Sequence, residues 1–148
     1  MGTMTKDVDH LNSFLRGELA AVETYRMALE KLDGSSGGYT DVVNCMRSHE
    51  KRVNLLRNAI IQAGGAPASG AGAWGMFAKA IEGSARIFGN DAAIAALEEG
   101  EDHGLADYKR DLKDLDLAAR SLIETEILPE QVETHRAMSK LKHHQAKS

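Results

Sequence analysis

The chain has 148 residues, of which 43% are hydrophobic and 27% charged, and its formal net charge is -4 at pH 7. This composition is ordinary for a single globular domain and excludes a disordered chain. No apolar run approaches the ~18 residues that a transmembrane helix requires, and no basic stripe with interleaved aromatic residues is present. We therefore expect neither a membrane nor a nucleic acid as partner.

The N-terminal sequence MGTMTKDVDHLNSF is polar and lacks the basic start and apolar middle of a secretory signal. The chain has a single cysteine, Cys45, so an intramolecular disulfide is impossible. Both observations predict a cytoplasmic protein.

Helix-forming residues dominate the sequence, β-branched residues are sparse and only two prolines occur, which predicts an all-α fold. Glycine-containing turns punctuate the chain at 33–38, 63–75 and 88–91. We expect one domain, 1–148, with four long helices near 8–32, 39–63, 91–115 and 117–142 and a shorter helix near 75–88.

The first three long helices each have an apolar face with steps of three and four residues, and a polar residue interrupts each face. Glu18 interrupts the first face and Glu101 the third. In the second helix His49 lies on the face and Glu50 at its border.

The fourth long helix has a similar predicted face that includes two polar residues, Thr125 and His135. Its members are Ala118, Leu122, Thr125, Leu128, Val132, His135, Met138 and Leu141. Pro129 lies in this helix, where it either kinks the helix and re-aims Glu133 and His135, or begins a new helix from its first turn.

A weak internal repeat with an offset of 83 residues relates the two halves of the chain. It pairs Gly17 with Gly100, Glu18 with Glu101, Tyr25 with Tyr108 and Glu50 with Glu133. Each half is interpreted as a helical hairpin, and the connection 64–90 is long enough to cross the length of a bundle. This predicts an up-down-down-up bundle, with Trp74 or Phe77 of the crossover buried against its outside.

Four segments carry a resemblance to a known family: LNSFLRGELAAVETYRMALEKL, GGAPASGAGAWGMFAKAIEGSARIFG, ALEEGEDHGLADY and ILPEQVETH. They resemble the ferritin-like four-helix-bundle proteins of the PA2169/DUF2383 type, which are bacterial proteins of unknown function. The resemblance covers nearly the whole chain and implies the ferritin-like fold. It implies no activity, because such families are defined by architecture.

Buried carboxylates need compensation, and ferritin-like dimetal sites provide it with two metal ions held by one Glu from each of two helices and Glu-x-x-His from each of the others. Helix arithmetic places six side chains of this sequence in one layer. The predicted ligands of a divalent Fe, Mn or Zn ion are Glu18, His49, Glu50, Glu101, Glu133 and His135.

The Glu-x-x-His motif itself is absent, because Val53 follows Glu50 by three residues and Arg136 follows Glu133 by three. This absence argues against a vigorous ferroxidase. The alternative is a metal-free polar layer, in which Glu18 and Glu101 accept hydrogen bonds from Tyr108, Tyr25 or Arg26 and a cation such as Arg136 neutralises the carboxylates.

Three functions remain open from the sequence. The first is a metal-binding protein with at most weak oxidase or peroxide chemistry, which we favour. The second is a stress-related binding or scaffold bundle with a degenerate, metal-free site. The third is a structural dimer whose polar layer specifies helix register. The sequence names no small-molecule substrate for any of them.

Apolar side chains beside the face of the first helix predict association with a second copy. Phe14, Leu19 and Met27 are not needed for the predicted face and offer apolar surface for pairing. We therefore expect a homodimer.

Overall fold

The computed structural model of the chain describes residues 2–32, 34, 38–70 and 90–146. Its helical elements are α1 (Gly2–Lys31), α2 (Tyr39–Gln62), α4 (Asn90–Asp111), a 3-10 turn (Leu112–Asp114), α5 (Leu117–Leu122), a π-helical turn (Ile123–Ile127) and α6 (Leu128–Ala146). The described residues contain no strand, which confirms the all-α prediction. None of their helices is long and apolar enough to cross a membrane. The expected helix near 75–88, with Trp74 and Phe77, lies outside the described residues.

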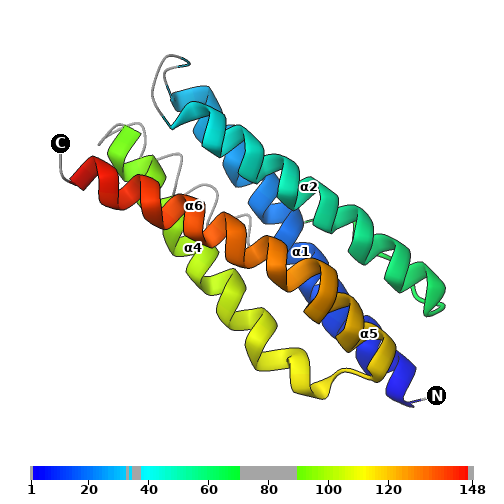
Figure 1. The fold of residues 1–148 in the computed structure, drawn as a ribbon. Coiled ribbons are helices and arrows are strands. Elements are labelled where there is room, and N and C mark those ends of the chain that lie inside the picture. Colours follow the sequence, from blue (N-terminus) through cyan, green and yellow to red (C-terminus); the bar gives the residue numbers. More distant parts are fainter. Residues whose placement is uncertain (1, 33, 35–37, 71–89, 147–148) are drawn as a thin grey trace.

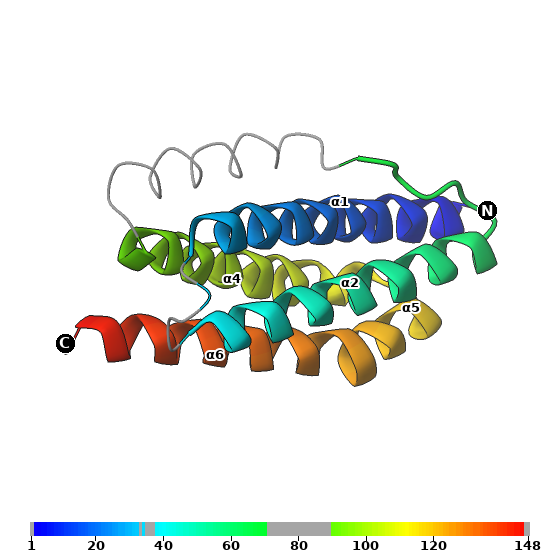
Figure 2. The same ribbon diagram turned by 90° about the horizontal axis from the view of Figure 1, so that it is seen from above.

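The helices form four long rods that lie side by side, with α5, the π-helical turn and α6 making up the fourth (Figure 1). α1 packs mainly on α2, and α4 mainly on α6. Each of these pairs is antiparallel, whereas α2 and α4 run in the same direction (Figure 2). The two pairs contact each other through α1 with α4 and through α2 with α6.

The predicted apolar faces of the first three long helices point into the interior, as their three-and-four spacing indicates. Their buried members include Leu11, Leu15, Glu18 and Tyr25 on α1, with Leu32 directly after it; Val42, His49, Val53, Leu56 and Ile60 on α2; and Ile94, Leu97, Glu101 and Tyr108 on α4. Hydrophobic burial of these faces therefore holds the rods together.

The core formed by the described residues consists of two apolar clusters. The first core cluster surrounds Leu15, Leu56 and Ile127, and the second surrounds Tyr25 and Met138. The buried polar residues that the sequence singled out in α1, α2 and α4 lie between these clusters, so the core is interrupted by a polar layer.

The predicted face of the fourth rod is only partly confirmed. Met138 is buried, and Leu122, Leu128 and Leu141 are half-buried against the core clusters, whereas Ala118 and Thr125 are exposed. The buried residues there are Ala119, Ile123, Ile127, Gln131, Thr134 and Met138. Their spacing of mostly four residues follows from the π-helical turn Ile123–Ile127, whose wide turns advance the chain by more residues than an α-helix does. The register after this turn is consequently shifted relative to an uninterrupted α-helix.

Pro129 explains why the π-helical turn occurs at this point. Proline cannot donate a backbone hydrogen bond, and its ring clashes with the carbonyl four residues earlier in a regular helix. The amide of Leu128 instead bonds to the carbonyl of Ile123, five residues back. The rod therefore continues through Pro129 in the first turn of α6, and it does so by widening the preceding turn.

Phe14 does not lie on a free surface, contrary to the expectation that it helps to form a dimer. It is buried in the first core cluster, with its ring centroid 4.7 Å from that of Tyr108. Leu19 is half-buried and packs against the same cluster, and Met27 is half-buried as well. The homodimer stays a prediction, and less apolar surface is available for pairing than the sequence indicated.

The shifted register of the fourth rod can be tested by comparing two truncations. Ile127→Ala removes a fully buried side chain and is expected to lower the free energy of unfolding by about 2–5 kcal/mol. Leu117→Ala, at a position that is 83% exposed, is expected to change it by less than about 0.5 kcal/mol. Urea denaturation measures both values. Equal losses for the two variants would show that the π-helical turn does not place Ile127 in the core.

Candidate functional site

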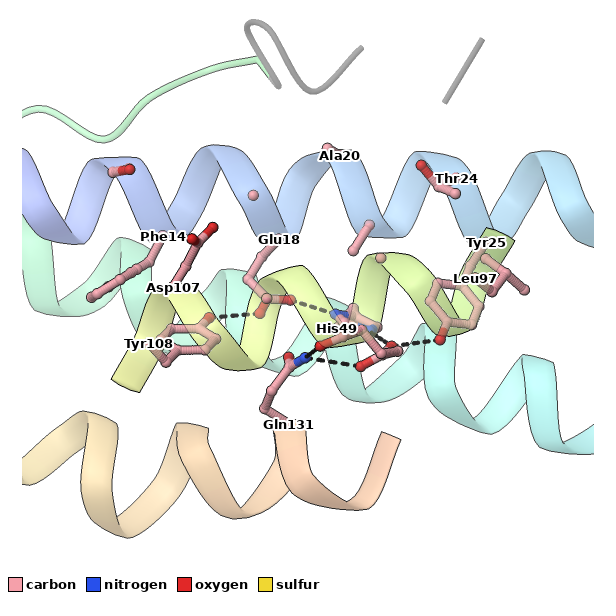
Figure 3. A pocket seen from close by; sticks show the side chains of 16 residues that line it. Phe14, Glu18, Ala20, Thr24, Tyr25, His49, Leu97, Asp107, Tyr108 and Gln131 are labelled. Carbon is pink, nitrogen blue, oxygen red and sulfur yellow. Dashed lines mark hydrogen bonds and ion pairs between the residues drawn. The ribbon is translucent and has the colours of Figure 1, made fainter. Parts of the chain in front are cut away.

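The centre of the polar layer is a histidine held between two glutamates from different helices. His49 Nδ1 of α2 lies 2.5 Å from Glu18 Oε2 of α1, and His49 Nε2 lies 2.7 Å from Glu101 Oε2 of α4. All three side chains are buried, and Figure 3 shows the contact between Glu18 and His49. Both ring nitrogens are therefore engaged with carboxylates, and the imidazole joins the two halves of the repeat.

Two tyrosines cross-link α1 and α4 through the same glutamates. Tyr108 of α4 donates its hydroxyl proton to Glu18 Oε1 of α1 at 2.6 Å, and Tyr25 of α1 donates to Glu101 Oε2 of α4 at 2.5 Å. The repeat thus places each tyrosine on the glutamate of the other half. This confirms the hydrogen bonds expected for a polar layer from both tyrosines, whereas Arg26 is exposed and lies outside the layer.

Arg52 is the cation of the layer, and its side chain is fully buried. Its Nη1 donates to Glu18 Oε1 at 3.3 Å and to the amide oxygen of Gln131. Its Nη2 donates to Thr134 Oγ1 at 2.9 Å and to Ser48 Oγ at 3.2 Å. One guanidinium therefore links α2 to α1 and to α6.

The fourth rod contributes neutral side chains to the layer. Gln131 Nε2 donates to Glu101 Oε1 at 3.0 Å and to the Glu101 carbonyl at 2.9 Å. Thr134 Oγ1 lies 2.6 Å from Glu101 Oε1. Gln131 reaches α4 beside Gly104, where the Cβ of any larger residue would lie 2.9 Å from Gln131 Nε2. Every rod thus supplies at least one member of the network.

The charges of the layer compensate one another. Burial alone would raise the pKa of Glu101, but the charge and hydrogen bond of His49, with the charge of Arg52, lower this pKa to about 2. Burial would likewise raise the pKa of Glu18, and Arg52 and His49 outweigh it, so that this pKa is lowered. Burial disfavours the charged form of His49, yet the two carboxylates raise its pKa above 6.5. The layer consequently holds two anions and two cations.

A cavity of about 60 Å³ adjoins this layer between α1 and α4 (Figure 3). Small residues of both helices contribute to its walls, and members of the layer and nearby side chains complete the lining. The residues that line it are Ser13, Phe14, Gly17, Glu18, Ala20, Ala21, Thr24, Tyr25, His49, Leu97, Gly100, Glu101, Gly104, Asp107, Tyr108 and Gln131.

The structure brings together three of the six predicted ligands, Glu18, His49 and Glu101, and the prediction of one buried layer is wrong for the other three. Glu50 is exposed, because it follows His49 directly and so lies about 100° further around the helix. Glu133 is also exposed and pairs with Arg136 at 3.0 Å.

His135 lies at the surface of the fourth rod, where its Nε2 contacts Asp102 Oδ1. The register shift at the π-helical turn places Gln131 and Thr134 inward, and therefore turns Glu133 and His135 outward. The expected cation is also a different one, because Arg52 and not Arg136 neutralises the carboxylates.

Sequence reasoning missed Arg52, Gln131 and Thr134. Arg52 stands three residues after His49, a spacing that places two side chains on the same side of a helix, so the signal for it was present. Gln131 and Thr134 were hidden by the assumption that the fourth rod is a regular α-helix.

A surface group on α4 and α6 could hold a metal ion. Glu98, Asp102 and His135 each offer a ligand atom, and these atoms lie within 4.8 Å of one another. Among the described residues, this is the one such group of three or more His, Cys, Asp or Glu side chains. Lys142 Nζ lies 3.6 Å from Glu98 Oε1 and would compete with an ion for that carboxylate.

Comparison with known proteins finds no matching family model, no matching curated protein and no matching solved structure. The functional argument therefore depends on the geometry of the chain itself.

The paired charges of the layer predict a pH dependence of stability. The lowered pKa of Glu101 contributes stability that is complete above about pH 4.5 and is lost as the pH falls toward 2. The raised pKa of His49 contributes stability that is complete below about pH 6.5 and is lost as the pH rises through its folded value. The stabilisation from the layer is thus greatest between these two values.

His49→Gln removes the titrating cation, so we expect the stability difference between wild type and variant to peak in this window and to shrink on either side. Urea denaturation across the pH range measures this difference. His103→Gln, which changes an exposed histidine of α4, is the control and should follow the wild-type profile. A difference for His49→Gln that does not vary with pH would contradict the assignment.

Proposed function

We propose that the chain is a ferritin-like four-helix-bundle protein whose carboxylate layer is complete without a metal ion, and that it acts as a non-enzymatic binding or scaffold protein. The observation that carries this proposal is the fully buried guanidinium of Arg52 beside Glu18. It lies where a dimetal bundle would need a metal ligand.

The positions of the layer correspond to those of a dimetal bundle, but their chemistry differs. Glu18 and Glu101 supply the single glutamates of two helices. On α2, the inward positions three residues apart are His49 and Arg52, and on the fourth rod they are Gln131 and Thr134. A dimetal bundle has Glu-x-x-His on each of these two helices. The carboxylates and imidazoles needed for two ions are therefore not supplied.

The residues that are present do not fit a divalent ion. A guanidinium stays protonated in proteins and offers no lone pair to a metal. Both nitrogens of His49 face carboxylates, and a metal would have to displace one of these contacts. An added divalent ion would also lie close to the buried charge of Arg52, which attracts Glu18 already.

A self-neutralised layer suits a scaffold better than an enzyme. Hydrogen bonds of the layer connect all four rods, so sliding one rod by a turn would leave buried charges without partners. The layer thus favours one register of the rods, which is the property a rigid binding or scaffold protein requires.

Arg52→Met tests this proposal. The variant leaves Glu18 buried without its guanidinium partner, and we expect the free energy of unfolding to fall by about 3–5 kcal/mol. Arg47→Met, at an exposed arginine of the same helix, is the matched control and should change little. Both are made together with His135→Ala, so that ions at the α4–α6 surface cannot contribute.

In the same His135→Ala background, metal analysis and thermal melting distinguish a metal-bound layer from a metal-free one. The melting temperature is measured with a chelator and with added Fe(II), Mn(II) or Zn(II). A protein that needs no ion keeps its melting temperature in all these conditions. A stoichiometric ion whose removal lowers the melting temperature of the parent protein would overturn the proposal. An unchanged stability of Arg52→Met would contradict the role given to Arg52.

A second candidate function is divalent metal binding at the surface, and the geometry of Glu98, Asp102 and His135 favours it. Two carboxylates and one imidazole are ligands that Zn(II) accepts, with water at an open position. Because the ligands come from α4 and from α6, a bound ion would cross-link these two helices.

Zn(II) is therefore expected to raise the melting temperature of the wild-type protein, and His135→Ala is expected to abolish most of this increase. His103→Ala removes an exposed histidine of α4 that is not part of the group, and it should retain the effect. Differential scanning fluorimetry with a chain that ends before His143 avoids binding by the terminal histidines. An equal response of both variants would exclude this site.

A further inference from the structure

We propose that the cavity between α1 and α4 binds a small neutral molecule with a short aliphatic part and one hydroxyl or amide group. The inference rests on the proposed function only in requiring that Arg52 and His49, and no metal ion, balance the carboxylates. Metal analysis of the same sample checks that requirement separately.

The size of the cavity limits the ligand. About 60 Å³ is available, and a water-sized group needs roughly 10–15 Å³ on this measure, so about four to six non-hydrogen atoms can be accommodated. Gly17 and Ala21 of α1 and Gly100 and Gly104 of α4 line it. Their small side chains leave the space open, and Phe14 and Leu97 add apolar wall suited to an aliphatic group.

Thr24 supplies the reason for a hydrogen-bonding group on the ligand. Its side chain lines the cavity, is only 4% exposed, and its hydroxyl has no hydrogen-bond partner among the described residues. A buried hydroxyl without a partner is unfavourable, and a ligand hydroxyl or amide in the cavity would satisfy it.

Glu18 offers an alternative polar contact, about 9 Å along α1 from Thr24, so one polar group on the ligand bonds to one of the two residues and not to both. From the described residues it accepts hydrogen bonds from Tyr108, His49 and Arg52. An ionised carboxylate has about four acceptor positions, so one of them remains for a donor on the ligand. Glu101 already accepts four, from Tyr25, His49, Gln131 and Thr134, and needs none.

The charge balance of the layer determines that the ligand is neutral. Glu18 and Glu101 line the cavity together with His49, and their charges are matched by a protonated His49 and by Arg52, which pairs with Glu18 at 3.3 Å without being part of the lining. An anion would face the two carboxylates, and a cation would face the imidazolium. Asp107 also lines the cavity, and its charge is partly balanced by Arg110 at 3.1 Å, a guanidinium that it shares with Asp111.

Three probes of equal chain length test this choice: 1-butanol, butylammonium and butyrate. They differ in charge, and each has a four-carbon chain of a size that the cavity can hold. Titrations followed by two-dimensional NMR are expected to show saturable shifts for 1-butanol at residues of the α1–α4 seam, and binding at least about tenfold weaker for both charged probes. Tighter binding of butylammonium or butyrate would overturn the assignment of a neutral ligand.

Two variants connect the binding to this cavity. Thr24→Val keeps the shape of the side chain but removes the hydroxyl, and should weaken 1-butanol binding about tenfold, the equivalent of one hydrogen bond. Ala21→Leu fills the cavity and should abolish binding. Thr125→Val, at an exposed threonine of the fourth rod, is the matched control and should bind as wild type does.

The melting temperature of unliganded Thr24→Val provides an independent readout, because replacing an unpartnered buried hydroxyl with a methyl group should maintain or raise stability. If Ala21→Leu fails to fold, Thr24→Val alone still tests the site. Equal 1-butanol binding by wild type, Thr24→Val and Thr125→Val would overturn the proposal. A crystal structure at saturating 1-butanol in which Thr24 bonds only to water would overturn it as well.

Discussion

Two carboxylates buried between apolar clusters are the constraint on which the rest of this structure depends. Glu18 and Glu101 would each be costly in the core without compensation. Arg52 and His49 provide it from α2, and the neighbouring hydroxyl and amide groups occupy most of the remaining acceptor positions. Because Arg52 cannot lose its proton, one glutamate must remain ionised to balance it, and the protonated imidazole of His49 balances the other.

This charge balance allows the layer to fix how the four rods align with one another. The histidine joins α1, α2 and α4, while Arg52 and Gln131 extend the network to α6. Gly104 shows how closely α4 and α6 approach, because even one methyl group there would press on Gln131. The apolar clusters on either side supply the hydrophobic stabilisation, and the layer determines how the rods align.

A set of glutamates and histidines in a helical bundle suggests a metal centre, but hydrogen-bond accounting gives a different interpretation. Glu101 has no acceptor position left for another group, and both nitrogens of His49 are engaged. Among the described residues that line the cavity beside the layer, Thr24 has a buried hydroxyl without a hydrogen-bond partner. Binding is therefore better supported at the edge of the network than at its centre.

The sequence by itself determined the all-α class, the inward faces of the first three helices and the burial of Glu18, His49 and Glu101, because a spacing of three and four residues specifies a helix face locally. It also indicated the hydrogen bonds from Tyr25 and Tyr108. Only the tertiary structure decided which residues complete the layer. The π-helical turn before Pro129 changes the register of the fourth rod, so Gln131 and Thr134 point inward and Glu133 and His135 outward. The burial of Arg52 was also decided by the tertiary structure, because a charged side chain is buried only when partners from other helices surround it.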